Sequence, residues 1–278
     1  MVIKYVNSAG KELLLNSSEL KIQEANFHAY SWRYNGKEKN RGISVSEFKK
    51  DEAKYKVKLC AYGTIEKRKE LFNKFLETTE YDIEKNTPGK LWFGDWYLEC
   101  FVIESETSPN KNYYTERNII IMGPSNEWIK TTTKNFLAKR NSQTKSKESN
   151  SDYPKNYLYD YDSKISTGKI INEGYSEEDF RMTIYGPVID PIVTIGGNVY
   201  QIYTEVKEKE YLIIDTSESI VEQYDNVGNK TIKYNSRNKN YKLFKKIPVG
   251  PNDVEWPGDF GFDILTYEKR SEPKWNLS

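Results

Sequence analysis

The sequence predicts a mainly β protein with one helix, arranged as two domains. Among its 278 residues are 22 Tyr, 11 Phe and 6 Trp, and aromatic side chains fit the half-buried surface of a sheet. Short stretches in which apolar and polar residues alternate recur along most of the chain, as in strands with one wet face. The length is about twice that of an average domain.

The first predicted domain covers residues 1–136. Short apolar stretches at 2–6 and 12–15 predict two strands, and the alternation at 55–62 predicts a third. At 64–80 the apolar residues change to helical spacing, with Glu, Lys and Arg between them. This pattern predicts an amphipathic helix that packs on a sheet.

Residues 24–53 are predicted to form an extended arm. The aromatic stretch at 27–34 predicts a strand, and side chains two residues apart share one face of a strand. The polar segment 35–42 predicts a turn or the tip of a hairpin, after which the alternation resumes. The arm residues expected at an oligomer interface are Tyr30, Trp32, Tyr34, Ile43 and Val45.

Residues 137–156 contain almost nothing that a core could bury, which predicts a linker or a disordered loop. The second domain, 157–278, is predicted to be a β-sandwich, and its last strands either complete it or return to the first domain. Within it, Phe180, Met182 and Ile184 alternate and should point inward.

The predicted linker gives a direct test by proteolysis. Brief trypsin treatment should cut first within 137–156, because this segment holds several Lys and Arg residues and few apolar ones. Two stable fragments on a denaturing gel are the expected result. First cleavage elsewhere, with this segment intact, would mean that the segment is ordered.

No sequence pattern points to a catalytic or metal site. The chain has one histidine, His28, which is expected to be a packed or surface side chain within the aromatic stretch. Phosphate-binding glycine loops, zinc-protease motifs, serine-hydrolase motifs and calcium loops are missing from the sequence. Cys60 and Cys100 each lie in an apolar run and are expected to be buried; free thiols are favoured, and one disulfide between them stays open. We therefore expect no enzyme activity, no metal and no cofactor.

A glycosidase-like carboxylate pair is the catalytic alternative that the sequence leaves open, because such a pair is formed only in three dimensions. Tryptophans beside acidic residues could stack on sugar rings, and Trp256, close to Asp259, is the candidate glycan contact. The candidate acids are Asp95, Glu99, Asp190, Asp215, Asp259 and Asp263.

The charge balance argues against a tight grip on nucleic acid. Forty-two basic residues face 41 acidic ones, so the formal net charge is +1. Strong binding to a phosphate backbone needs a basic surface. A neutral surface still allows DNA to pass without being held. No apolar run is long enough for a transmembrane helix, and no signal pattern begins the chain, so synthesis in the cytoplasm and no membrane contact are expected.

The order of several weak motifs resembles one known family. The second half contains Phe-Arg-Met-Thr-Ile-Tyr-Gly-Pro from Phe180, Tyr-Leu-Ile-Ile-Asp-Thr from Tyr211, and Pro-Val-Gly-Pro-Asn from Pro248. In the first half, Pro-Gly-Lys-Leu begins at Pro88, and Ile-Ile-Ile-Met-Gly-Pro begins at Ile119. Together these pieces resemble the distal tail protein (Dit) family of long-tailed phages over nearly the whole chain, except 137–156.

The resemblance implies an N-terminal domain like a tail-tube β-barrel or sandwich and a C-terminal β-sandwich of galectin-like form. It also implies a hexameric ring in the virion, between the tail tube protein and the tail-tip hub, through which DNA passes without specific binding. The arm should pack on a neighbouring copy, by strand addition to an exposed sheet edge, and the alternative is that it folds back on its own domain. Two alternatives stay open: a carbohydrate-binding tail module and a tail-associated hydrolase.

Overall fold

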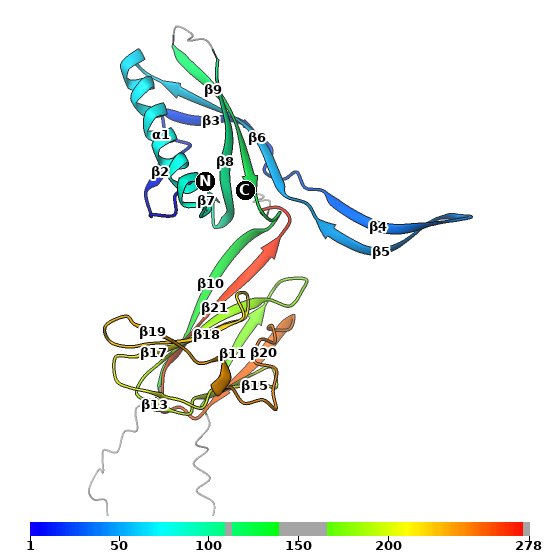
Figure 1. Cartoon of the computed structure of the whole chain (residues 1–278), viewed down its shortest axis with the longest axis vertical. Coiled ribbons are helices and arrows are strands. Elements are labelled where there is room, and N and C mark those ends of the chain that lie inside the picture. The colour runs from blue at the N-terminus through cyan, green and yellow to red at the C-terminus, as the bar shows by residue number, and fades with distance from the viewer. Residues whose placement is uncertain (109–112, 139–165, 275–278) are drawn as a thin grey trace, which may run out of the picture. The chain divides into compact units, whose positions relative to one another are not determined.

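The computed structural model describes residues 1–108, 113–138 and 166–274 (Figure 1). It confirms the predicted fold class, since strands dominate and α1 is the one α-helix of the described residues. The chain divides into two compact units. Unit 1 contains Met1–Lys130 and the chain from Lys269 onward, and unit 2 contains Thr131–Glu268. Of the predicted linker, residues 139–156 lie outside the described residues.

Unit 1 is an antiparallel barrel of short and long strands. Its strands are β1 (Ile3–Val6), β2 (Glu12–Leu14), β3 (Leu20–Ala25), β6 (Ala53–Tyr62), β7 (Gly89–Phe93), β8 (Trp96–Thr107) and β9 (Tyr114–Gly123). The long strand β8 pairs with β7 along its first half and with β9 along its second half. On the other side of the unit, the Ile22 amide donates to the Leu15 carbonyl at 2.8 Å, which joins the end of β2 to β3.

The core of unit 1 contains large aromatic side chains. Trp128, at the start of β10 (Trp128–Phe136), is fully buried, and its indole N–H donates to the Tyr55 hydroxyl at 3.0 Å. The Phe27 ring meets the rings of Tyr55, Phe93 and Trp128 at centroid distances between 5.5 and 5.8 Å. Cys60 and Cys100 are buried, as expected, and both are free thiols; burial raises the pKa of Cys100.

Helix α1 (Ile65–Lys85) begins at the N-cap Thr64, whose hydroxyl accepts from the Lys67 amide at 3.3 Å. The sequence predicts its start well, but the helix runs five residues past the predicted end at residue 80. Its last turns bury polar side chains instead of apolar ones. The Thr78 and Thr79 hydroxyls donate back to helix carbonyls, which removes the cost of burying them.

Asp82, at the end of α1, ties the helix to the first strand. This fully buried carboxylate accepts from the Tyr5 hydroxyl at 2.5 Å and from the Ser8 amide at 2.7 Å. Burial raises the pKa of Tyr5. Gly89 lies so close to Tyr5 and Asp82 that a Cβ atom there would overlap both side chains.

Unit 2 is a β-sandwich. One sheet has the order β19-β18-β17-β12-β21-β10 and the other the order β11-β20-β14-β15. The strands of the first sheet are β12 (Asp179–Tyr185), β17 (Tyr211–Asp215), β18 (Ile220–Tyr224), β19 (Lys230–Ile232) and β21 (Phe262–Arg270). Those of the second are β11 (Ser166–Asn172), β14 (Ile192–Ile195), β15 (Asn198–Gln201) and β20 (Gly250–Trp256). The short strands β13 (Val188–Ile189) and β16 (Glu205–Val206) pair with each other, and a 3-10 turn covers Tyr234–Ser236.

The two sheets of unit 2 share one core. Phe180, Met182 and Ile184 of β12 are fully buried, which confirms the predicted inward face. From the other sheet, Val193 and Val254 join the same apolar cluster. Because each sheet buries only one face, the opposite residues of each strand remain polar or partly exposed.

Candidate functional site: an amphipathic hairpin arm

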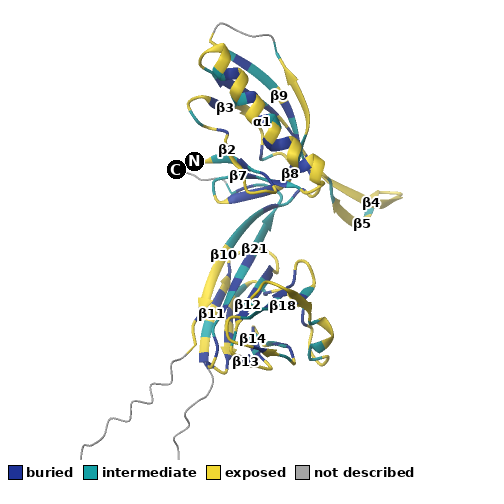
Figure 2. Cartoon of the chain, turned by 60° about the vertical axis from the view of Figure 1, so that its left-hand side comes forward, coloured by how far each residue is buried: buried dark blue, intermediate teal, exposed yellow. Residues whose placement is uncertain are grey.

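Unit 1 carries a two-stranded hairpin that is separate from its barrel. Strand β4 (Trp32–Lys39) pairs with β5 (Gly42–Lys50), from Trp32 opposite Lys50 to Lys39 opposite Gly42. Asn40 and Arg41 form the tip, and Gly42 takes a φ of 95° that favours glycine. Figure 2 shows both strands almost wholly exposed.

The predicted arm differs from this hairpin at its root and its tip. The structure begins the arm at Trp32, because residues 24 and 25 belong to β3, a strand that the sequence analysis missed. Phe27 is a core residue, and Tyr30 precedes β4, so the predicted strand over 27–34 is wrong in its first half. The segment 35–42, predicted to be a turn or hairpin tip, does contain the tip at Asn40 and Arg41, but the turn is shorter than the segment because backbone pairing extends to Lys39 and Gly42.

A β-bulge sets which side chains share a face of the arm. Asn35 is opposite Glu47 and Gly36 is opposite Val45, so Ser46 is an extra residue in β5. Its hydroxyl donates to the Asn35 carbonyl at 2.9 Å. An extra residue shifts the alternation by one position. Phe48 therefore lies on the same face as Val45, opposite Tyr34, where strict alternation would have placed it on the other face.

We call this surface the arm face. It consists of Trp32, Tyr34, Ile43, Val45 and Phe48. These side chains are between 43% and 62% exposed, and the Tyr34 and Phe48 rings lie 6.5 Å apart. Four of the five residues were predicted, and Phe48 was missed because the bulge that reorients it has no signature in the sequence. The fifth predicted residue, Tyr30, is exposed next to the arm but outside its strands.

The arm is fixed to unit 1 by ion pairs at its root. Arg33 Nε lies 2.6 Å from Asp51 Oδ1, and Lys50 Nζ lies 3.0 Å from Glu127 Oε1. Lys50 also lies over the Trp32 ring, 5.5 Å from its centroid. Beyond the root the hairpin is supported only by its own pairing. A two-stranded hairpin alone is marginally stable in water, so an arm of this kind needs a partner surface.

The arm is also basic. Between Trp32 and Lys50 there are six basic residues and two acidic ones, a net charge of +4 in a chain whose total is +1. An exposed apolar face of five side chains beside such charge is typical of a surface that binds another protein.

The single histidine, considered in the sequence analysis as a candidate catalytic residue, has a packing role in the structure. The His28 ring packs edge-on against Phe93, with centroids 5.7 Å apart. Within the described residues, no group of three or more His, Cys, Asp or Glu side chains could hold a metal ion. No helix in the described part of the chain is long and apolar enough to cross a membrane.

These observations predict that neither EDTA nor His28→Ala changes the oligomer mass measured by light scattering. His28 contacts Phe93 through its ring edge, and alanine removes that contact without leaving a buried charge. A loss of oligomers after either treatment would show that a metal or the imidazole supports assembly.

Of the six acids considered for a hydrolase, Asp215 is the buried one. Its carboxylate lies 2.8 Å from Arg181 Nε and accepts hydrogen bonds from the Ser217 and Glu218 amides. These partners use its oxygen atoms in holding the fold together. Asp263 accepts from the Tyr185 hydroxyl at 2.8 Å, and burial raises the pKa of Tyr185 to about 12. Asp95, Glu99, Asp190 and Asp259 are exposed.

Trp256 is not placed to contact a glycan, which corrects the expectation from the sequence. Its ring is buried, 5.6 Å from the Phe136 ring and 5.3 Å from the Phe262 ring. The indole N–H donates to the Phe260 carbonyl at 3.1 Å. Strand β20 alternates, and Trp256 falls on its inward side. In the sequence, Trp256 close to Asp259 resembles a tryptophan that stacks on a sugar ring. Its burial in the structure shows that it does not.

Comparison with known proteins gives a likeness in structure alone. No protein-family model matches the sequence, and no curated protein matches it. Among solved structures, the Dit protein of phage SPP1 is similar over 97% of this chain and 100% of its own, with a TM-score of 0.62 and 7% identity. Two structures of the activated phage p2 baseplate, with Sr and with Ca, contain chains similar over 98% of this chain, with TM-scores of 0.60 and 0.59 and 13% identity.

The structural likeness extends over nearly the whole of both chains, so it includes the barrel, the sandwich and the strands that join them. It confirms at the level of the fold the resemblance that the order of sequence motifs predicted. This chain has the fold of the phage distal tail protein Dit.

Proposed function

We propose that this protein is a structural component of a phage tail, a distal tail protein that forms a ring. The observation that carries the proposal is the likeness to SPP1 Dit over 97% of this chain and 100% of that one. That protein is described as a paradigm of the hub adsorption apparatus of phages that infect Gram-positive bacteria. A likeness over both units, without a large insertion, favours the same kind of role.

The arm supports assembly from identical copies. Its exposed apolar face would pack on a sheet of the neighbouring copy, a contact that joins two different surfaces. Such heterologous contacts close into a ring when the rotation between copies allows it. Six copies are the number that the family resemblance suggests. The predicted interface residues Tyr30, Trp32, Tyr34, Ile43 and Val45, with Phe48 added, belong to this proposal.

In such a ring the protein would join the tail tube protein to the tail-tip hub, and the genome would pass through the centre. A formal net charge of +1 supports a passage that does not hold the phosphate backbone. The protein would act in the virion, at the tip of the tail, after synthesis in the host cytoplasm.

No catalytic role is proposed. Asp215, the buried candidate acid, is bound by Arg181 and by backbone amides, and Trp256 is a core residue. The carbohydrate-binding alternative therefore loses the side chain on which it depended.

The purified chain tests the ring directly. Native mass spectrometry should find a complex near 196 kDa, the mass of six 32.6 kDa chains, and negative-stain images should show rings with a central opening. A monomer at micromolar concentration, or a closed dimer, would contradict a ring held by the chain itself.

A further inference from the structure

Unit 2 carries a strongly basic stretch of chain, which runs from β19 to the loop before β20 (Figure 1). Residues 230–246 contain seven basic side chains and no acidic one, although the formal net charge of the whole chain is only +1. We call residues 230–246 the basic segment. So one-sided a stretch of charge in a nearly neutral chain marks a candidate surface for an anionic ligand.

The basic segment is fixed along the outer edge of the second sheet of unit 2, where β15 is the last strand. The side-chain amide of Asn198 donates to the Lys242 carbonyl at 3.0 Å. The Tyr200 hydroxyl donates to the Lys245 carbonyl at 2.6 Å. Because the two lysines are held through their backbone carbonyls, their exposed ammonium groups stay available for a ligand.

The strands beneath the segment do not neutralise it, since residues 192–204, which include β14 and β15, contain no charged side chain. Ion pairs occur at its two ends, where Lys230 lies 2.9 Å from Glu222 and Lys246 lies 3.0 Å from Asp179. Within the described residues, the five cations between these ends form no ion pair. They are Lys233, Arg237, Lys239, Lys242 and Lys245.

Arg237 is held in one orientation by its neighbours. Its guanidinium carbon lies 3.8 Å from the centre of the Tyr234 ring, and Nη1 donates to the Tyr234 carbonyl at 2.9 Å. The Tyr234 ring is in turn stacked on the Phe244 ring, with centroids 5.8 Å apart and planes within 1° of parallel. A guanidinium fixed on an aromatic ring keeps its other N–H groups for a planar, bidentate contact with a phosphate.

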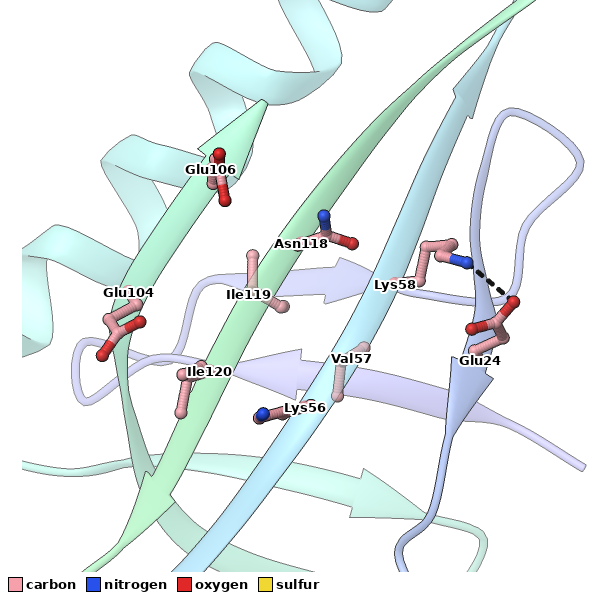
Figure 3. Close-up of a pocket in the computed structure, with 9 residues that line it drawn as sticks. All are labelled: Glu24, Lys56, Val57, Lys58, Glu104, Glu106, Asn118, Ile119 and Ile120. Carbon is pink, nitrogen blue, oxygen red and sulfur yellow. Dashed lines mark hydrogen bonds and ion pairs between the residues drawn. The ribbon is translucent and has the colours of Figure 1, made fainter. Parts of the chain in front are cut away.

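The groove on the outer face of unit 1 lacks this uniform charge (Figure 3). Its volume is about 260 Å³, and its lining includes Lys56 and Lys58 together with Glu24, Glu104 and Glu106. Lys58 lies 2.7 Å from Glu24, as the dashed line shows. Mixed charges of this kind give a polyanion no net attraction, so the groove is not its site.

The arrangement of the basic segment favours a polymer of phosphodiesters without bases. A row of separate cations can neutralise the phosphates of successive repeats, whereas a single small anion would use only one or two of them. Binding of bases would need open aromatic faces for stacking. Tyr234 does not offer one freely, because its ring is already in contact with the Arg237 guanidinium and the Phe244 ring.

We propose that the basic segment binds a polyol-phosphate polymer of the host cell surface, a chain of glycerol or ribitol units joined by phosphodiesters. The source of the polymer rests on the proposed function, which places the protein at the tip of the tail, where the virion meets the cell. Lys239, Lys242 and Lys245 neutralise successive phosphates, and Arg237 binds one through its planar fork. The binding site lies within one chain and does not need the ring.

Neutralisation of three exposed cations tests the site. The variant carries Lys239→Gln, Lys242→Gln and Lys245→Gln, and fluorescence anisotropy measures binding of labelled synthetic poly(glycerol phosphate) to the full chain at several salt concentrations. The association constant of a single-stranded polyanion falls with salt with a logarithmic slope of about 0.7 per neutralised phosphate. The slope should therefore fall by about 2, and the affinity at low salt should fall by roughly tenfold or more.

A second variant, Arg237→Lys, keeps the charge and removes the planar fork. It should weaken binding severalfold while the salt slope stays the same. This combination separates a positioned guanidinium from a general positive charge. A chain with Arg237→Lys that binds as tightly as the unchanged protein would overturn the assigned role of Arg237.

The matched control carries Lys69→Gln, Lys74→Gln and Lys207→Gln, three exposed lysines outside the basic segment, and should bind as the unchanged protein does. Circular dichroism must show that all variants are folded. An unlabelled oligothymidylate with the same number of phosphates should displace the polymer no better than unlabelled poly(glycerol phosphate) does. Displacement at a tenfold lower concentration would assign the segment to nucleic acid and overturn the proposal.

Normal binding by the triple variant, or an equal loss in the control, would also overturn the proposal. Failure of the ring is a separate result. If the chain forms rings but does not bind the polymer, only the polymer site is wrong. If it binds the polymer but forms no ring, the proposed ring is wrong and the site on unit 2 remains.

Discussion

A chain in which residues 36–41 are replaced by a short Gly-Ser turn, and which also carries Trp32→Ser, is expected to be a folded monomer. The change removes the tip of the hairpin and Trp32, the largest side chain of the arm face, while the barrel core does not include these residues. Buried tryptophans at interfaces commonly contribute about 2 kcal/mol or more, which corresponds to roughly thirtyfold in each dissociation constant. Light scattering reports the mass, and thermal unfolding reports the fold.

Lys49→Ser, on the polar side of the arm and outside the replaced segment, is the matched control and should keep the oligomer, since it leaves the arm face intact. If the shortened, Trp32→Ser chain stays folded and keeps the native mass, the arm does not hold the ring.

Replacement of Trp256 by alanine is expected to destabilise unit 2 by about 3–5 kcal/mol, because a buried tryptophan leaves a large cavity when it is truncated to alanine. The loss includes ring contacts with Phe136 and Phe262 and the hydrogen bond to Phe260. Urea unfolding followed by circular dichroism measures the effect. Trp256→Phe, which keeps an aromatic ring, should lose less.

Trp32→Ala provides the comparison, since that ring is 44% exposed and its removal should change the unfolding free energy little. A Trp256→Ala chain of normal stability that no longer bound a glycan would restore the carbohydrate-binding alternative. Because Trp256 is buried, we expect that a loss of glycan binding in the Trp256→Ala chain would occur only together with unfolding of unit 2.

The fold class and most strands were predictable because their signals are local. Strict alternation in β12 and the Gly196-Gly197 turn between β14 and β15 follow from side-chain periodicity and from glycine's access to positive φ. Helix α1 was predicted only as far as its apolar pattern continued. Its last turns hold Asp82 in a buried network with Tyr5 and Ser8. Tyr5 is 77 residues away in the chain, so the sequence around Asp82 does not indicate this contact.

By itself the sequence determined a two-domain β protein and an aromatic arm, together with the absence of known catalytic motifs. It also placed Trp32, Tyr34, Ile43 and Val45 on that arm. Only the tertiary structure decided that Phe27 and Trp256 are core residues and that Ser46 is an extra residue in β5. The physical reason is that burial and register depend on the opposing strand. A side chain's face is fixed by the residue it pairs with, and that residue can be distant in the chain.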